Sequence, residues 1–315
     1  MKIKKIAITI GDPAGIGPEI VLKAVMSHEI AGICEPLIVG DRAVIEEAID
    51  KLGIPAGIRD LELIDADSIR DRNFQKNRPT AEGGKACVSY IKKVVELALN
   101  KSIDAVVTAP ISKEALKMAG LKWPGHTEML AELTNTKNFA MMFYSDKLKV
   151  ILVTIHTALK NVPEMIKKEK VLKTIMLAKK SCDMLDIKNP RIAVSGLNPH
   201  AGESGIFGDE EIKEIIPAIE ETQKMGIPVL GPYPADALFH KAYNGEFDII
   251  VCMYHDQGLT PFKMVAFEKG VNMTVGLPII RTSPDHGTAY DIAWKGIANP
   301  ASIIEAIKLA ARVKI

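Results

Sequence analysis

The chain has 315 residues, of which 47% are hydrophobic and 25% charged, and 40 basic residues against 39 acidic ones give a net charge of +1. This composition is typical of a soluble globular protein with two domains or one large α/β unit. The near-neutral charge argues against nucleic acid or an anionic membrane as the main partner, because both select basic surfaces.

Predicted strands and helices alternate along the whole chain. In chain order, near-continuous apolar runs predict strands at 6–11, 35–40, 104–110, 140–144, 150–156, 191–199, 248–255 and 271–278. Helices are predicted at 82–100, with Val88, Ile91, Val95 and Leu99 on one stripe, at 209–226 and at 299–313. This alternation predicts an α/β fold whose mixed, largely parallel sheet is covered by helices.

Cysteine usage and the N-terminal sequence indicate a cytoplasmic protein. Cys34, Cys87, Cys182 and Cys252 share no CxxC spacing and lie in apolar stretches, so we expect buried thiols, not zinc ligands or disulfides. The N-terminal MKIKKIAITIG runs into DPAGIGPEI without a small-residue cleavage site, which indicates a first strand and not a signal peptide. No apolar run approaches the ~18 residues of a membrane span.

Three histidines share one context. His156, His200 and His255 each follow or end an apolar strand. In open α/β sheets, ligands bind outside the carboxyl ends of the strands. One such histidine alone is more often a loop residue, but three neutral imidazoles can form a first shell for a divalent cation. Asp256 and Glu203 are both candidates to orient a ligand imidazole.

Two further polar clusters are candidates for binding an anion. In GHTEML, His126 and Thr127 lie where a helix is predicted to begin, with Thr127 as a possible N-cap. Lys263, Asn272 and Arg281 follow within one stretch and could bind a phosphate or carboxylate. The alternatives are a plain capped helix and solvated surface charges.

Two loops are candidates for binding a nucleotide. GDPAGIGPEI begins at Gly11 and matches neither GxGxxG nor GxxxxGK[ST], so it predicts a tight turn at a cleft, with Pro18 in a first helical turn. DHGTAYDIAWKGIANP carries His286, Asp291 and Asn299 before the last helix. Asp291 could accept hydrogen bonds from an adenosine ribose, and its charge would favour NAD over NADP.

These motifs together resemble the 4-hydroxythreonine-4-phosphate dehydrogenase family of pyridoxal phosphate biosynthesis, in its order and over essentially the whole chain. The motifs are GDPAGIGPEI, TAPISKEAL, GHTEMLAE, NPHAGESGIFGDEE, PADALF, MYHDQGLTPFK and VNMTVGLPIIRTSPDHGTAYDIA. The tail is also similar to the NAD loop of isopropylmalate and isocitrate dehydrogenases, which share that family's fold. Trp294 departs from those relatives, which usually carry glycine there; it would pack at the adenine side or cover the sheet edge.

The resemblance implies roles for particular residues. His156, His200 and His255 match metal ligands (Zn, Mg or Co) at a homodimer interface where both subunits contribute. Matches to substrate contacts are His126, Thr127, Lys263, Asn272 and Arg281, and Asp236 and Asp256 match acids of the site. We expect an isocitrate/isopropylmalate dehydrogenase-like fold of two domains with a cleft between them: 1–128 plus 268–315 on the NAD side, and 129–267 with the metal ligands and dimer contacts.

The expected reaction is metal-assisted hydride transfer to NAD from a phosphorylated hydroxy acid, followed by decarboxylation of the β-keto product. Asp236, Asp256 and a metal-bound water are candidate bases, and Lys263 and Arg281 would bind phosphate or carboxylate. D-erythronate or D-threonate 4-phosphate is the rival substrate. Rivals of other classes are a phosphate acyltransferase of the same fold and a non-catalytic binder of phosphorylated ligands.

Overall fold

A computed structural model describes residues 3–55 and 61–314, which form two compact α/β units. The first unit comprises the described residues of Met1–Lys137 and Leu277–Val313, so it is built from both ends of the chain. The second comprises Asn138–Gly276 with Lys314. The unit boundaries lie further along the chain than the predicted domain boundaries at 128 and 267, and that division into domains stays a prediction.

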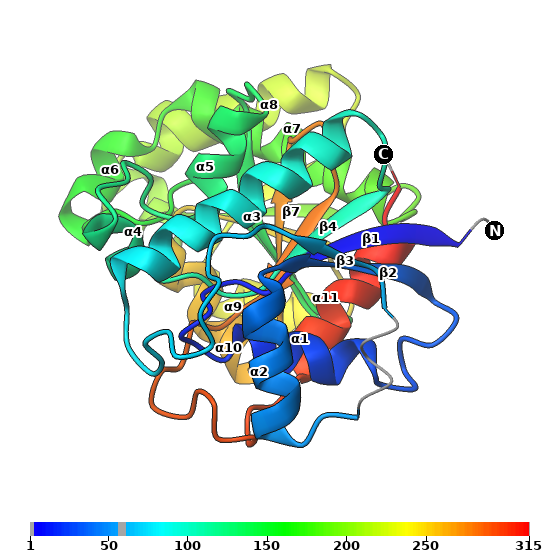
Figure 1. Cartoon of the computed structure of the whole chain (residues 1–315). Helices are drawn as coiled ribbons and strands as arrows, with labels where there is room; N and C mark the ends of the chain where they lie inside the picture. Colours follow the sequence, from blue (N-terminus) through cyan, green and yellow to red (C-terminus); the bar gives the residue numbers. More distant parts are fainter. Residues whose placement is uncertain (1–2, 56–60, 315) are drawn as a thin grey trace. The chain divides into compact units, whose positions relative to one another are not determined.

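The first unit contains a parallel sheet in the order β3-β2-β1-β4-β11. Its strands are β1 (Lys4–Thr9), β2 (Cys34–Gly40), β3 (Leu63–Asp65), β4 (Ala105–Thr108) and β11 (Arg281–Pro284). Its helices are α1 (Gly17–Val25), α2 (Arg42–Leu52), α3 (Ala81–Leu99), α4 (Lys113–Met118), α5 (His126–Leu133) and α11 (Ala301–Arg312). Figure 1 shows α3 on one face of these strands and α1, α2 and α11 on the other.

The second unit contains a mixed sheet in the order β10-β5-β6-β9-β7-β8. Its strands are β5 (Ala140–Tyr144), β6 (Lys149–Leu152), β7 (Ile192–Ser195), β8 (Val229–Tyr233), β9 (Ile249–Cys252) and β10 (Val271–Val275). Its helical segments are η2 (Leu159–Asn161), α6 (Val162–Met165), α7 (Lys168–Met184), η3 (Pro199–Gly205), η4 (Glu211–Ile215), α8 (Ile216–Lys224), α9 (Ala235–Tyr243) and α10 (His255–Ala266). Only β5 runs antiparallel to its two neighbours among the strand pairs described within this unit.

The predicted α/β class and the mixed, largely parallel pairing are confirmed. All eight predicted strands are present, but β3, β8 and β11 were not predicted, because they are short or contain polar, glycine and proline residues. The 209–226 helix begins as a π-helical turn, η4, and continues as α8. Leu99 is 48% exposed, contrary to the predicted stripe, because it ends α3 and no later turn covers it.

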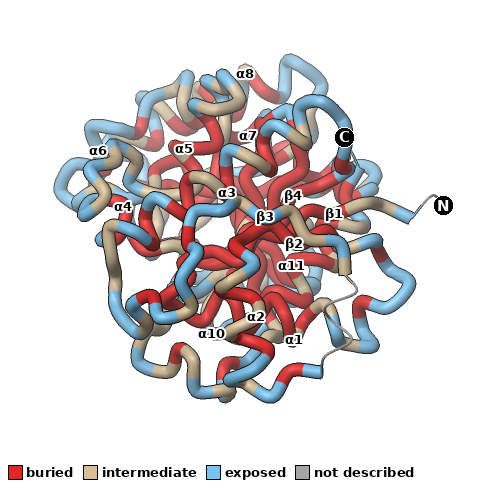
Figure 2. The backbone as a smooth tube through the Cα atoms, in the orientation of Figure 1, coloured by how far each residue is buried: buried red, intermediate tan, exposed pale blue. Residues whose placement is uncertain are grey.

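Burial follows the strands in both units, as Figure 2 shows in red. The core of the second unit packs β5, β6 and β9 against α9 and α10, with Phe143, Val150, Ile250 and Phe262 among its members. Each such side chain contributes about 1.5–3 kcal/mol relative to exposure. All four cysteines are free and buried, as predicted. Among the described residues, no helix combines the length and apolarity that crossing a membrane requires.

Candidate functional site

Three parallel strands of the second unit deliver the three predicted metal ligands. β6, β9 and β7 are adjacent in that order, and His156, His255 and His200 follow their carboxyl ends. Hydrogen bonding between these two segments continues past the ends of β6 and β9. Thr154 N donates to Met253 O, and the Thr154 hydroxyl donates to the same carbonyl at 2.7 Å. The loops that carry His156 and His255 therefore leave the sheet side by side.

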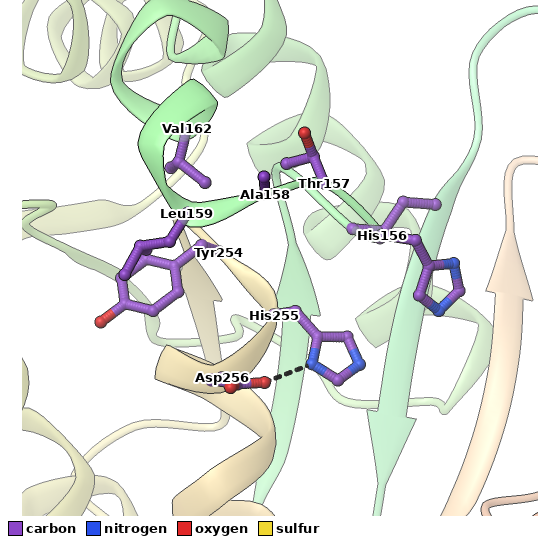
Figure 3. A pocket seen from close by; sticks show the side chains of 9 residues that line it. His156, Thr157, Ala158, Leu159, Val162, Tyr254, His255 and Asp256 are labelled. Carbon is purple, nitrogen blue, oxygen red and sulfur yellow. Dashed lines mark hydrogen bonds and ion pairs between the residues drawn. The ribbon is translucent and has the colours of Figure 1, made fainter.

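The structure brings His156 and His255 together. Their ring centroids lie 5.7 Å apart, and Figure 3 shows Asp256 on the other side of His255 from His156. Asp256 Oδ1 lies 2.7 Å from His255 Nδ1. A carboxylate on one ring nitrogen fixes the tautomer and orientation of an imidazole and directs the other nitrogen to a metal. Of the two orienting acids considered, Asp256 has this contact.

His200 does not join them within the chain. It is exposed, its ring centroid lies 6.1 Å from that of Phe207, and it sits in a left-handed turn after β7. In the part of the chain that the structure describes, no three His, Cys, Asp or Glu side chains come close enough to hold a metal ion. The described part of the chain thus brings two of the three predicted imidazoles together and leaves His200 apart from them.

A pocket of about 540 Å³ adjoins the paired imidazoles (Figure 3). Its walls come from two segments, 155–159 with Val162, and 254–256. Leu159 and Tyr254 give it an apolar side, while His156, His255 and Asp256 give it a polar one. This combination can bind a small molecule that has both apolar and polar groups.

In the first unit, the buried Arg281 and the half-buried His126 are candidates for binding an anion. Arg281 is 2% exposed at the start of β11 and donates to Thr108 Oγ1 from Nε (3.2 Å) and Nη2 (2.7 Å). Burial lowers the pKa of Arg281 to about 9. Burial and, secondarily, the charge of Arg281 hold the pKa of His126 well below its usual value, so its imidazole is neutral. The buried His126 Nε2 has no hydrogen-bond partner among the described residues, which fits a ligand oxygen.

The other predicted substrate contacts lie on different elements. Thr127 is buried in the first turn of α5. Gly125, not Thr127, occupies the N-cap position, because the helix begins at His126, two residues earlier than an N-cap at Thr127 requires. Lys263 is half-buried on α10 with Nζ 5.4 Å from the Phe267 ring centroid, and Asn272 is half-buried on β10. Asp236 is exposed in the first turn of α9.

The glycine-rich turn after β1 contacts the predicted NAD loop. Gly11 has φ +68°, and a Cβ there would lie 2.4 Å from Pro110 O, so only glycine fits. Asp12 accepts hydrogen bonds from Tyr290 Oη (2.6 Å) and Ala14 N (2.9 Å), and its burial raises its pKa. Trp294 donates to Pro13 O at 3.0 Å and packs on Phe74 with ring centroids 5.5 Å apart. Trp294 thus covers the turn, and its φ of +61° is a left-handed conformation that glycine adopts more readily.

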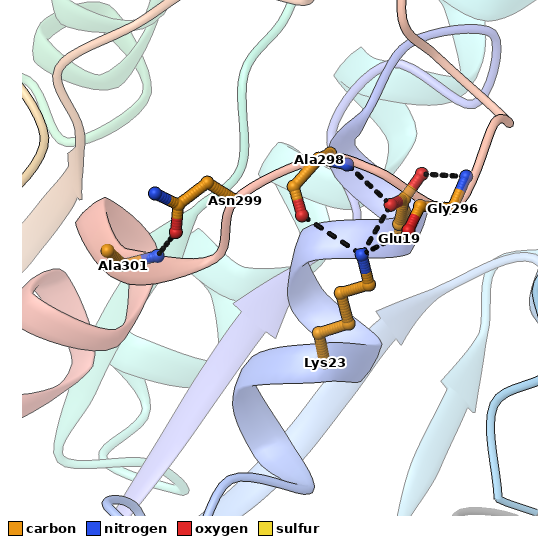
Figure 4. A network of polar contacts seen from close by, with 6 residues as sticks. All are labelled: Glu19, Lys23, Gly296, Ala298, Asn299 and Ala301. Atoms are coloured by element: carbon orange, nitrogen blue, oxygen red, sulfur yellow. Dashed lines mark hydrogen bonds and ion pairs between the residues drawn. The ribbon is translucent and has the colours of Figure 1, made fainter.

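An ion pair between the half-buried Lys23 and the buried Glu19 ties the end of that loop to α1 (Figure 4). Glu19, which is 1% exposed, accepts from Ala298 N (2.8 Å) and Gly296 N (3.2 Å). Lys23 donates to Glu19 (2.7 Å) and to the carbonyls of Gly296 (2.8 Å) and Ala298 (3.0 Å). Asn299 Oδ1 accepts from Ala301 N at the start of α11, while His286 and Asp291 are exposed.

We predict that Glu19→Gln weakens both stability and cofactor binding. The variant removes the charged acceptor of Lys23 and of two backbone amides, which costs about 1.5–3 kcal/mol, and it loosens the segment that carries Asn299. Urea unfolding should show this loss, and the KM for NAD should rise. Asp183→Asn is the matched control, because it removes the exposed i,i+4 partner of Lys179 and should cost about 0.5 kcal/mol or less. Equal effects of both variants would contradict the assignment.

Sequence reasoning missed several polar residues that shape these sites. They are Asp12, Glu19, Glu211, Gln257 and Tyr290. Asp12, Glu19, Glu211 and Gln257 are buried, and a buried polar side chain needs partners. An acid within a motif of small and apolar residues, as in GDPAGIGPEI, could have indicated a buried polar side chain. Its partner could not be found in the same way, because Asp12 and Tyr290 are 278 positions apart.

Parallel strands that end in histidines, a buried guanidinium and a glycine-rich turn place the chain among α/β enzymes that bind small anionic molecules. The chain belongs to the pyridoxal phosphate biosynthetic protein PdxA family, whose model matches residues 32–310. It is 48% identical to a 4-hydroxythreonine-4-phosphate dehydrogenase of Desulforapulum autotrophicum over 97% of this chain and 94% of that protein.

Two further relatives agree with this assignment. A D-threonate 4-phosphate dehydrogenase of Pectobacterium atrosepticum is 43% identical, covering 98% of each chain. The crystal structure of 4-hydroxythreonine-4-phosphate dehydrogenase from Klebsiella pneumoniae superposes with a TM-score of 0.90 at 39% identity, covering 99% of this chain and 98% of that one. The resemblance predicted from the sequence motifs is thus confirmed.

Proposed function

We propose that this chain oxidises 4-phosphooxy-L-threonine with NAD to a β-keto acid that decarboxylates to 3-amino-2-oxopropyl phosphate, in pyridoxal phosphate biosynthesis. It is a dehydrogenase of the PdxA family that acts on a secondary alcohol with decarboxylation. The observation that carries the proposal is the convergence of His156 and His255, with Asp256 on Nδ1 of His255, at the ends of adjacent parallel strands.

The donor set fits a divalent cation. The ring centroids of His156 and His255 lie 5.7 Å apart, and Asp256 orients the second ring. The two imidazoles can supply two nitrogen ligands and leave positions for a third imidazole and a substrate oxygen. We propose His156, His255 and a partner subunit's copy of His200 as the ligand set for Zn, Mg or Co. When bound, the cation supplies Lewis-acid stabilisation of a developing alkoxide, and NAD accepts the hydride.

The chain's own residues bind the substrate and move the proton. The buried guanidinium of Arg281 and the neutral His126 suit a phosphate or carboxylate. Thr127 in the same unit, and Lys263 and Asn272 in the second unit, are the other proposed substrate contacts. Asp236 and Asp256 are the proposed acceptors of the hydroxyl proton. Asp256 already contacts His255 Nδ1, so in this chain its orienting role has the stronger support.

The proposed NAD contacts are Gly11, His286, Asp291 and Asn299. They lie in the turn after β1 and in the loop before α11. Tyr290 and Trp294 of that loop donate hydrogen bonds to Asp12 and Pro13 of the turn, and Ala298 N donates to Glu19 in α1. The exposed Asp291 carboxylate would accept from ribose hydroxyls and repel a 2′-phosphate. We therefore propose NAD, not NADP, as the cofactor.

We also propose a homodimer with a shared site, in a reducing cytoplasm. Large apolar side chains are exposed beside His200 and on α10 or just after it; they are Ile206 (72%), Phe207 (49%), Met264 (85%) and Phe267 (74%). Exposed apolar surface of this kind favours burial against a second protein surface. Four free buried thiols fit a reducing compartment.

D-threonate 4-phosphate, or its erythronate isomer, is the second candidate substrate. The observation that favours it is the 43% identity with a D-threonate 4-phosphate dehydrogenase, close to the 48% identity with a 4-hydroxythreonine-4-phosphate dehydrogenase. These substrates carry a hydroxyl where 4-phosphooxy-L-threonine carries an amine.

Parallel assays of NADH formation test the proposal. With Co²⁺ or Zn²⁺ present, we expect kcat/KM for 4-phosphooxy-L-threonine to exceed that for D-threonate and D-erythronate 4-phosphate by about tenfold or more, the effect of about 1.4 kcal/mol. A reversed preference would transfer the assignment to the second candidate. If the protein formed no NADH from any of these substrates but made an acyl phosphate from an acyl-thioester and phosphate, both dehydrogenase assignments would be wrong and the phosphate acyltransferase hypothesis would hold.

A further inference from the structure

The segment that carries His200 has an unusual backbone. His200, Ala201, Gly202, Glu203 and Ser204 are five consecutive residues with φ between +43° and +83°. L-residues visit the left-handed region singly and avoid it in runs, because Cβ approaches the following carbonyl oxygen. Such conformations persist where the surroundings determine them, and they concentrate at functional sites. The turn from His200 to Ser204 therefore needs a structural cause.

Glu211 supplies that cause. Its carboxylate is 1% exposed, and Oε1 accepts from Leu197 N (2.7 Å) and Asn198 N (2.8 Å) while Oε2 accepts from Asn198 Nδ2 (2.9 Å). A Cβ on Gly202 would lie 2.8 Å from Oε2, so the carboxylate fills the inside of the turn. Glu211 also opens a π-helical turn, which is rare and often marks functional sites.

Gln257 connects the same segment to the loop of His255. Its Nε2 donates to Gly196 O at 2.7 Å, and its Oε1 accepts from Met253 N at 2.6 Å. Gln257 is buried and lies two residues after His255. The base of the left-handed turn is thus hydrogen-bonded on one side to Glu211 and on the other to the strand end that presents His255.

We propose that Glu211 is a positioning residue that maintains the left-handed turn and so orients His200 as a metal ligand. The inference rests on the proposed function, in which His200 binds the cation. Glu211 does not touch the metal. It acts by satisfying the amides of Leu197 and Asn198, which fixes where the chain enters the turn.

Glu211→Gln tests this, with Glu210→Gln as the matched control. Glu210 Oε2 accepts from the same Asn198 Nδ2 at 2.7 Å, whereas the two backbone amides donate to Glu211. Co²⁺ affinity is measured by equilibrium dialysis and visible absorption, and amide exchange is measured at 197 and 198. We expect Glu211→Gln to weaken Co²⁺ binding by about 10–100-fold, to speed exchange at both amides and to leave the KM for NAD unchanged. Glu210→Gln should change none of these.

The outcomes separate the inference from the function on which it rests. If wild-type protein binds Co²⁺ and the Glu211→Gln variant binds it with the same affinity, the positioning role of Glu211 is overturned but the proposed function is not. Failure of wild-type protein to bind Co²⁺ overturns both. If Glu211→Gln does not fold, the Glu211→Asp variant is measured in its place. It retains the charge but moves the carboxylate back by one methylene. Weakened Co²⁺ binding with an intact fold supports the positioning role, whereas unchanged binding refutes it.

Discussion

Replacing His255 by alanine should lower turnover by about 10³-fold or more and abolish stoichiometric binding of a divalent cation. The substitution removes one of two converging imidazoles and leaves Asp256 without the ring that it contacts. Loss of Lewis-acid stabilisation costs several kcal/mol of transition-state free energy. NADH formation and metal content after dialysis measure the two effects.

His240→Ala is the control for this variant. His240 is an exposed histidine near the end of α9 whose side chain contacts Asn244, and it belongs to the same unit. We expect its turnover and metal content to match those of wild-type protein. Retention of metal and turnover by the His255 variant would show that the paired imidazoles are not a metal site.

Replacing Arg281 by methionine should have opposite effects on activity and stability. We expect kcat/KM to fall by about 10²–10³-fold, because truncating a buried partner of a charged ligand costs about 2–5 kcal/mol. We expect the ligand-free protein to become more stable, because burial lowers the pKa of Arg281 and so makes its charge less favourable in the folded chain than in the unfolded one. Steady-state kinetics and thermal unfolding measure these changes.

The pKa of Arg281 sets the pH range of the stability gain. The folded-state pKa is lowered to about 9 from an ordinary 12.5, so the unfolded chain binds this proton more tightly. The charge therefore costs stability at pH values below about 9, and the cost is present in full at neutral pH. Arg191→Met is the control: Arg191 is exposed and paired with Asp248, and its loss should change stability little. A destabilised Arg281→Met variant with normal kcat/KM would contradict the anion site.

The alternation of apolar runs was sufficient to predict the α/β class and to place three histidines after strands. It could not predict which strands are neighbours in the sheet, and therefore not that His156 and His255 converge while His200 stands apart. Local sequence also gave no indication of the left-handed turn at 200–204, because only one of its five residues is glycine. That conformation depends on Glu211, a tertiary contact.

The anion site was predictable only as a set of residue types. Arg281 and His126 are separated along the chain, and β11 was not predicted because RTSP has no apolar pattern. Burial makes this pair distinctive, since it lowers both pKa values, and burial of a polar residue cannot be read from a short motif. Likewise, the i,i+4 spacing of Glu19 and Lys23 is typical of a surface ion pair. In the structure Glu19 is buried, because the 296–298 segment covers it.

The most direct test of the account removes the metal from the wild-type protein. Protein treated with a chelator and dialysed is assayed for NADH formation with 4-phosphooxy-L-threonine while Zn²⁺, Co²⁺ or Mg²⁺ is titrated back. We predict no turnover in the metal-free protein and recovery that saturates near one cation per chain. Full turnover without added cation, in protein verified to be metal-free, would contradict the assignment of His156 and His255 as metal ligands.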